Sequence, residues 1–260
     1  MDSCVRLLPD YAKLKNGQRA LEKVGIVGYK QYQRDFSSRR TITTQAAYVD
    51  LQDENGIHMS RLSGCLRDHA NATISINHEL LESLLDSHNA SSAYWECDWE
   101  QAHQLENEQD IFIKCKLEGV ITQDTEDWFL TIEVPYASVC PCAAAMCESE
   151  EDGHPHMQRA MTRITGQLDT DDDLDELLTT IVSRVVDVVD LVPVPYMKRP
   201  DELDWCKRAG QTNLFVEDAS RVIGNAIDGF VEDWVVVCTH YESIHQHNVV
   251  SVCRKGKMLV

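Results

Sequence analysis

The stretch IFIKCKLEGVITQDTEDWFLTIEVPY, residues 111–136, contains two strand-like segments separated by a short polar linker. Residues 111–121 and 128–136 are rich in β-branched and aromatic side chains and partly alternate apolar with polar positions, as half-buried β-strands do. The linker TQDTED has the polarity and length of a hairpin loop. The two segments are therefore expected to form an antiparallel pair.

The same succession of elements is expected on either side of this pair. The N-terminal half reads as strands 22–31 and 41–51, helices 59–69 and 77–88, and strands 93–100 and 111–121. The C-terminal half reads as strands 128–136 and 160–168, helices 174–190 and 216–230, and strands 233–241 and 247–255. Each half has the order ββααββ, which indicates an internal repeat with one unit over residues 20–124 and a second over residues 125–257.

Caps and apolar stripes support these helices. Asn77 can cap the helix 77–88, and the aspartates of 171–173 suit the positive end of the helix 174–190. The apolar residues that share one helix face are Leu80, Leu81, Leu84 and Leu85, then Leu174, Leu177, Leu178, Ile181, Val185 and Val189, and finally Val222, Ile223, Ala226 and Ile227. Each helix is thus expected to pack through one face.

The expected fold class is α+β, with a two-layer arrangement of antiparallel sheets that carry helices on one face. Uncovered sheet faces and edges favour closure by a partner subunit, so we expect a homo-oligomer. Residues 143–158 and 192–213 are rich in Gly, Pro and charge and are expected to be long loops. Long loops on a rigid scaffold are where chemistry tends to lie.

Composition narrows the class of protein. With 260 residues, 43% of them hydrophobic, the chain can bury a substantial core. It has no apolar run long enough for a membrane span, and its first residues, MDSCVRLLPDYAKLK, lack the apolar core of a signal peptide. We expect a soluble, cytoplasmic protein. The net charge of −19 opposes binding to nucleic acid, so a polyanionic ligand would need a local basic pocket.

Most of the ten cysteines are expected to be reduced, and Cys65, Cys115, Cys238 and Cys253 are expected to fill the core. The stretch ASVCPCAAAMCESEEDGHPHMQR, residues 137–159, is different because it combines three cysteines with two histidines. A disulfide between Cys140 and Cys142 would be strained, and no second paired cluster points to a structural zinc site. A mixed thiolate and imidazole site with an open coordination position remains, against the alternative of unrelated buried cysteines and exposed histidines.

Four further polar stretches lie at the ends of expected elements. They are HMSR at 58–61, MKRPDE at 197–202, FVEDASR at 215–221 and YESIHQH at 241–247. Singly, each can be a surface turn, a helix start or two same-side strand residues. Together with CPC at 140–142 and HMQR at 156–159, and in this order, they make the chain resemble the type IB GTP cyclohydrolases from about residue 40 to residue 250.

This resemblance implies the tunnelling fold (T-fold), in which tandem ββααββ units close into barrels as homo-oligomers, either dimers or tetramers. It implies conversion of GTP and water to formate and 7,8-dihydroneopterin triphosphate, the first step of folate biosynthesis, with a divalent metal that could be zinc, manganese or iron. Two alternatives stay open. One is the archaeal iron-dependent cyclohydrolase, which gives a cyclic phosphate, and the other is a noncatalytic purine- or pterin-binding protein of the same fold.

The resemblance also assigns roles to residues. The implied metal ligands are Cys140, His156 and Glu202, and His247 lies near the metal either as a further ligand or as a proton carrier. Cys140, His245 and His247 are the candidate catalytic residues, with the histidines suited to carrying protons. Glu217 would accept hydrogen bonds from the guanine N1–H and 2-amino groups. The candidate triphosphate ligands are Arg61, Arg159, Lys198, Arg199 and Arg221.

The chain departs from the family pattern after CPC. The family usually continues with Ser-Lys and a short connection to its histidine, whereas this chain has the longer, acidic AAAMCESEEDGHPH. Cys147 and His154 therefore rival Cys142 and His156 as ligands, and the roles of Cys142, Cys147 and His154 stay open. The Asp-Val-Gln segment with which family members usually begin is not found.

Overall fold

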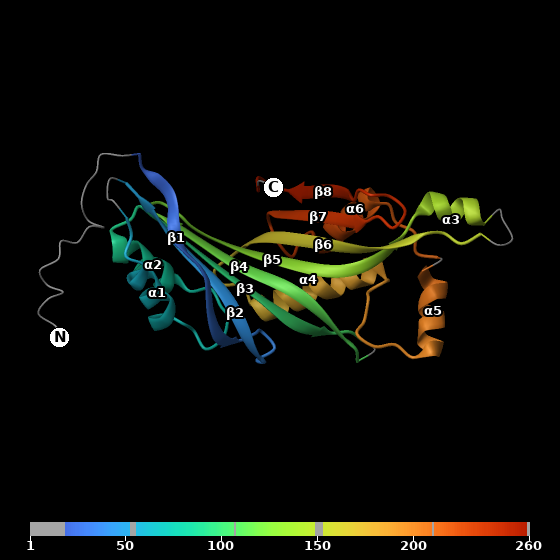
Figure 1. Cartoon of the computed structure of the whole chain (residues 1–260), viewed down its shortest axis with the longest axis horizontal. Helices are drawn as coiled ribbons and strands as arrows, with labels where there is room; N and C mark the ends of the chain where they lie inside the picture. The colour runs from blue at the N-terminus through green and yellow to red at the C-terminus, as the bar shows by residue number, and fades with distance from the viewer. Residues whose placement is uncertain (1–18, 53–55, 107, 149–152, 210, 259–260) are drawn as a thin grey trace, which may run out of the picture. The chain divides into compact units, whose positions relative to one another are not determined.

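The computed structural model describes residues 19–52, 56–106, 108–148, 153–209 and 211–258. The strands within these residues are β1 (Leu21–Arg34), β2 (Arg40–Leu51), β3 (Ser92–Gln104), β4 (Asp110–Thr122), β5 (Glu126–Val139), β6 (Met157–Leu168), β7 (Trp234–Tyr241) and β8 (Val249–Lys255). The helices are α1 (Met59–Asp68), α2 (His78–His88), α3 (Pro141–Cys147), α4 (Leu174–Val189), α5 (Arg199–Ala209) and α6 (Val216–Ile227) (Figure 1). All twelve elements of the expected double ββααββ order are present.

The strands form one eight-stranded sheet in the order β1 to β8. The pairs β1–β2, β2–β3, β6–β7 and β7–β8 are antiparallel. We expected two sheets, whereas all eight strands belong to one sheet, in which β4 and β5, the strands expected to pair, are neighbours. The hairpin between them is tighter than the six-residue loop we predicted, because the Thr122 N–H donates to the Thr125 carbonyl at 2.8 Å.

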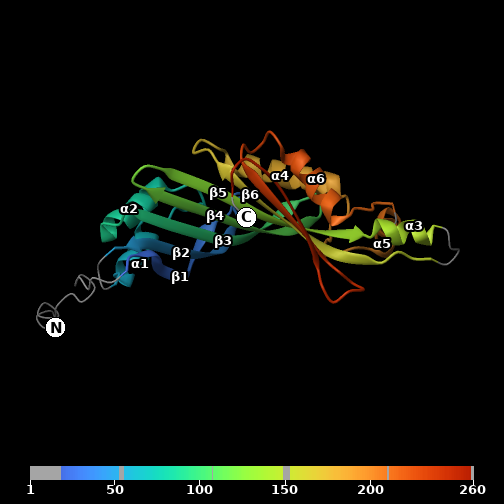
Figure 2. The same cartoon turned by 90° about the horizontal axis from the view of Figure 1, so that it is seen from above.

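The chain divides into two compact units. The first comprises the described residues up to Trp99 together with Leu117–Trp128. In it, α1 and α2 pack against β1 and β2 (Figures 1 and 2). Asn77 caps α2 as predicted, because its side chain accepts from the Leu80 N–H at 3.1 Å. Leu80, Leu81 and Leu84 are buried, which confirms the predicted face of α2.

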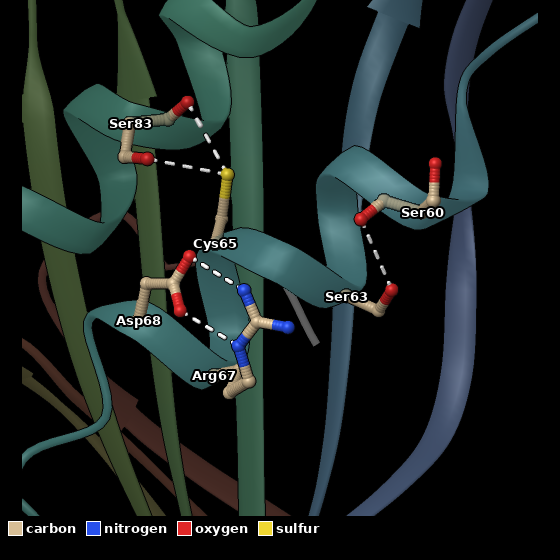
Figure 3. Close-up of polar contacts among 6 residues, drawn as sticks. All are labelled: Ser60, Ser63, Cys65, Arg67, Asp68 and Ser83. Atoms are coloured by element: carbon tan, nitrogen blue, oxygen red, sulfur yellow. Dashed lines mark hydrogen bonds and ion pairs between the residues drawn. The ribbon is translucent and has the colours of Figure 1, made fainter. Parts of the chain in front are cut away.

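Cys65 shows how the core cysteines are used. It lies on α1, is buried, and faces α2, where the Ser83 hydroxyl donates to its sulfur at 3.2 Å (Figure 3). Cys115 and Cys238 are buried as well, while Cys253 is half-buried. Burial raises the pKa of the Cys97 thiol to about 12, which keeps that thiol protonated and unreactive at neutral pH. Cys65, Cys115 and Cys238 act as small core residues, as expected, whereas the prediction for Cys253 holds only in part.

The second unit comprises the described residues of Glu100–Lys116 and those from Phe129 onward. Here α4 and α6 pack on each other, and α6 contacts β7 and β8 (Figure 2). Asp173 caps α4 by accepting from the backbone N–H groups of Asp175 and Glu176. The α4 residues buried by this packing are Leu174, Leu178, Ile181, Val182, Val185 and Val189. The predicted apolar stripe is confirmed, except that Val182 replaces Leu177 in the buried set.

Two helices lie where we predicted long loops, so those loop predictions were wrong. The first is α3, which covers the start of 143–158, where Pro141 at the first helical position and Ala143–Ala145 favour a helix. The second is α5, inside 192–213, with Asp201 and Glu202 in its first turn and Lys207 and Arg208 in its last, as the helix dipole prefers. The acidic residues 149–152 after α3 lie outside the described residues.

Candidate metal and nucleotide site

Cys140 lies at the junction of β5 and α3. It is the N-cap residue of α3, in an extended conformation, and Pro141 begins the helix because its fixed φ suits the first helical position. The Cys140 N–H donates to the His156 carbonyl at 3.4 Å, which brings the residue before β6 beside the end of β5. Both residues are half-buried. The backbone therefore holds two of the predicted metal ligands as neighbours.

The loop between β7 and β8 reaches the same place. Ser243 places its hydroxyl 3.5 Å from Nδ1 of His156. Further along this loop, the rings of His245 and His247 stack with centroids 5.1 Å apart and planes 8° apart. Both histidines are exposed. The two candidate proton carriers thus form a pair on a loop that contacts His156 through Ser243.

Helix α5 carries Glu202 and follows Lys198. All three of Lys198, Arg199 and Glu202 are exposed at the start of the helix. The other side of α5 is docked, because Trp205 packs against a buried cluster that includes Val139, Ala144, Leu191 and Ala209. This cluster joins α5 to the end of β5 and to α3, the elements that hold Cys140. The sequence placed Glu202 on a surface turn or loop, and the structure places it on a helix.

The four predicted ligands are brought together only in part. Among the described residues, no group of three or more His, Cys, Asp or Glu side chains is arranged to hold a metal ion. Cys140 and His156 adjoin through their backbones, and a thiol and an imidazole are part of the donor set that a zinc-like ion prefers. The Glu202 and His247 side chains are not gathered with them in a single chain.

The alternative ligands lie around α3. Cys142 is exposed, Cys147 is half-buried and His154 is exposed. Gly153 passes so close to Cys147 that a Cβ atom at position 153 would lie 2.8 Å from the Cys147 Cα. Within the described chain, none of these three residues belongs to a metal-binding group either.

Glu217 lies in the first turn of α6 and is exposed. Its neighbour Asp218 accepts from Arg221 at 3.0 Å, so this arginine already has a carboxylate partner. Ser220 donates its hydroxyl proton to the Glu217 carbonyl at 3.0 Å, which fixes the backbone of this turn. The predicted base-binding carboxylate is thus presented to solvent at the N-terminal end of a helix.

The remaining predicted phosphate ligands lie in different places. Arg61 belongs to α1 in the first unit, where it donates to the Ser87 carbonyl at 3.0 Å. Arg159 is on β6 in the second unit and lines a cavity of about 590 Å³. The other side chains that define this cavity include Pro135, Met157, Met161 and Tyr241. Its lining is mainly apolar, with Arg159 as the cation.

One buried polar pair was not predicted. The Tyr136 hydroxyl lies 2.9 Å from Nε2 of His240, and the two side chains are 1% and 2% exposed. Burial lowers the pKa of His240, against the opposing charges of Glu242 and Glu217, and burial raises the pKa of Tyr136. The sequence did contain a signal for a buried histidine. His240 continues the series of every second residue, Val236 and Cys238, that is buried along β7.

No helix among the described residues combines the length and the hydropathy needed to cross a bilayer.

Comparisons with known proteins give the family. A family model described as "Type I GTP cyclohydrolase folE2" matches residues 8–251. GTP cyclohydrolase FolE2 of Halorhodospira halophila is 28% identical over 253 residues, which cover 92% of this chain and 95% of that protein. The corresponding protein of Hydrogenovibrio crunogenus is 26% identical, with 96% and 94% of the two chains covered.

Among solved structures, uricase from Arthrobacter globiformis has a similar fold, with a TM-score of 0.53 and 10% sequence identity over 94% of this chain and 96% of that one. At that identity the likeness concerns the fold alone. The family model, by contrast, extends over nearly every described element, from β1 into β8. The chain belongs to the type I GTP cyclohydrolase folE2 family.

Proposed function

We propose that this protein is a cytoplasmic GTP cyclohydrolase that converts GTP and water to formate and 7,8-dihydroneopterin triphosphate, the first step of folate biosynthesis. The observation that carries the proposal is family membership over residues 8–251, a range that contains each residue assigned to the site. The adjoining Cys140 and His156 support it from the geometry. Thiols buried as core residues, such as Cys65 and Cys238, agree with a reducing compartment.

In this proposal Cys140, His156, Glu202 and His247 hold one divalent ion, which is zinc, manganese or iron. When bound, such an ion lowers the pKa of a coordinated water and so supplies a nucleophile for C8 of guanine. Support comes from three contacts that converge on this region. Cys140 and His156 are joined by their backbones, Ser243 ties the β7–β8 loop to His156, and Trp205 docks α5 against the end of β5.

The substrate is held by the chain's own charges. Glu217 accepts hydrogen bonds from the guanine N1–H and 2-amino groups, which selects guanine over adenine. Lys198, Arg199, Arg159 and Arg221, together with Arg61 of the first unit, are the proposed sources of positive charge for the triphosphate. His245, and His247 as the alternative to its role as a metal ligand, carry protons between the water, the opening ring and the solvent. Their exposed position on the β7–β8 loop suits this exchange.

The enzyme is proposed to work as a dimer or tetramer in which tunnelling-fold sheets close into a barrel. Support comes from the two end strands of the sheet, which carry exposed apolar side chains. Val27 and Tyr32 on β1 are 71% and 64% exposed, and Val250 on β8 is 61% exposed. Apolar side chains on an end strand are costly in water and favour pairing with another chain.

The test is formate release from GTP by the full chain loaded with zinc, manganese or iron, compared with a Cys140→Ala variant. We expect metal-dependent formate from the wild type and a loss of at least about a hundredfold in the variant. The mass of the product separates a linear triphosphate from a cyclic phosphate. Nucleotide binding without formate under every metal would overturn the catalytic proposal, and a cyclic product would overturn the stated reaction.

A further inference from the structure

The buried Tyr136–His240 pair lies inside the second unit, on the side of the sheet that α6 covers. The two rings meet edge to face, with centroids 5.6 Å apart and planes 72° apart, and their polar atoms share one hydrogen bond. The two residues are far apart in sequence and come from β5 and β7. A hydrogen-bonded pair with both members nearly inaccessible has a fixed orientation.

The position of α6 above this pair follows from two contacts. A Cβ atom on Gly224 would lie 3.4 Å from the Cys253 sulfur, and the Ser220 hydroxyl lies 2.8 Å from the Ser251 hydroxyl. The step of one helical turn from Gly224 back to Ser220 therefore corresponds to the step of two residues from Cys253 back to Ser251 on β8. These steps match because a turn rises about 5.4 Å and two strand residues span about 6.6 Å.

The same step places the first turn of α6 over the histidine. The same four-residue step before Ser220 reaches Val216, which is buried and adjoins Glu217, and two residues before Ser251 is Val249, which is paired directly with His240. The first turn of α6, which carries the exposed Glu217, therefore lies over the part of the sheet that holds His240. The negative charge of Glu217 opposes the burial-induced lowering of the His240 pKa, which agrees with this placement.

We propose that His240, oriented by Tyr136, is a positioning residue for Glu217, the carboxylate that binds guanine. The inference rests on the proposed function and extends it to a pair of residues that do not touch the substrate. With the Tyr136 O–H donating to Nε2, the neutral imidazole carries its proton on Nδ1. That N–H dipole beneath the first turn of α6 favours one orientation of the Glu217 carboxylate. Without the tyrosine hydroxyl, the His240 ring is no longer held in this orientation, and the carboxylate loses its preferred orientation.

The test is a double-mutant cycle on nucleotide binding. The probe is 7-deaza-GTP, which keeps the N1–H and 2-amino edge of guanine but lacks N7, so its five-membered ring does not open. Tyr136→Phe keeps the ring and its packing and removes only the hydroxyl. We expect the Kd of the metal-loaded protein for 7-deaza-GTP to rise about tenfold in Tyr136→Phe. In a Glu217→Gln background the same change should add less than about twofold.

Two controls separate positioning from general stability. Thr43→Val removes a buried hydroxyl of the first unit, one that donates to the Gln33 side chain at 3.0 Å, and should lower Tm without changing the Kd. Glu242 is the other acid whose charge reaches His240, and Tyr136→Phe should keep its full tenfold effect in a Glu242→Gln background. A second variant of the pair, His240→Gln, should show the same coupling to Glu217.

Additive effects of Tyr136→Phe and Glu217→Gln, or an unchanged Kd in both Tyr136→Phe and His240→Gln, would overturn the positioning role. Coupling to Glu242 instead of Glu217 would overturn it as well. Failure of the wild type to release formate from GTP would instead refute the proposed function, so the two failures are distinguishable.

Discussion

The backbone N–H of Cys140 donates to the backbone carbonyl of His156, and this contact joins the end of β5 to the start of β6. The chain between them contains α3 and the acidic residues 149–152, which distinguish it from the shorter connection of the family pattern. Because the two strands are neighbours in the sheet, their ends stay adjacent whatever the connection holds. A longer loop can thus be inserted here without separating the two candidate ligands.

This relationship predicts that Cys140 and Cys142 have different roles although only Pro141 separates them. Cys140→Ser should reduce the metal retained after gel filtration by about tenfold to a hundredfold, since a coordinating thiolate is lost. Cys142→Ser changes an exposed residue of α3 and should keep metal content and formate release within about twofold of wild type. Metal analysis of both purified variants gives the comparison. Equal metal loss in the two variants would mean that both cysteines bind the metal.

Glu217 and Asp218 offer a matched pair in the first turn of α6. Glu217→Gln should lower kcat/KM for GTP by about a hundredfold or more, because a neutral amide cannot accept both hydrogen bonds from the N1–H and 2-amino groups as a carboxylate does. Asp218→Asn removes an exposed ion pair with Arg221 and should cost under about 1 kcal/mol of stability with little kinetic effect. Steady-state kinetics on both variants, with Tm as a check on folding, decide the matter. Unchanged kinetics in Glu217→Gln would reject its role in binding the base.

Substitution of glycine by alanine is expected to have opposite effects on stability at two positions. Gly119 on β4 lies against Trp128, and a Cβ there would come within 2.6 Å of the indole ring and 3.0 Å of the Leu81 side chain. Gly119→Ala should destabilise the protein by about 1–3 kcal/mol through overpacking. Gly64 lies within α1 with no atom within 4 Å of an added Cβ. Gly64→Ala should stabilise by about 0.5–1 kcal/mol, and urea unfolding of both variants measures the difference.

Most of the fold could be predicted because its strands and helices carry strong periodic signals. The α4 stripe and the caps at Asn77 and Asp173 are local features, and each appears in the structure where the sequence placed it. Helix α5 was missed because it buries little, with Ala209 as its only buried member among the described residues. Its apolar contact is through the half-buried Trp205, so no amphipathic repeat marks it.

The site could be predicted only as a set of residue types. The nearness of Cys140 to His156 depends on the order of β5 and β6 in the sheet, which the repeat suggested. The Tyr136–His240 pair depends on the register of β6 with β7, where Ala160 faces His240. A polar residue in a buried strand position indicates that it has a partner, but the sequence does not say which residue that partner is.

His88 predicts a pH dependence of stability in the first unit. Burial, helped by Arg61 and His58, lowers the pKa of His88 to about 4. The neutral ring accepts the His58 N–H at Nε2, at 3.0 Å, and its Nδ1 lies 2.6 Å from the Ser87 hydroxyl. Protonation at Nε2 would replace that acceptor with a donor facing another donor. The folded state therefore favours the neutral imidazole.

The sign of the effect follows from proton linkage. Between about pH 6.5 and about pH 4, the unfolded chain binds a proton at His88 that the folded chain does not, so this contribution is complete above the unfolded pKa and is lost as the pH falls. His88→Gln keeps an acceptor for the His58 N–H but cannot titrate. Urea unfolding at about pH 7 and about pH 5 should show a larger loss of stability in the wild type than in His88→Gln. Parallel losses in the two proteins would mean that His88 is already solvated or titrates normally, and the buried hydrogen bond from His58 would then contribute nothing to the acid sensitivity of α2.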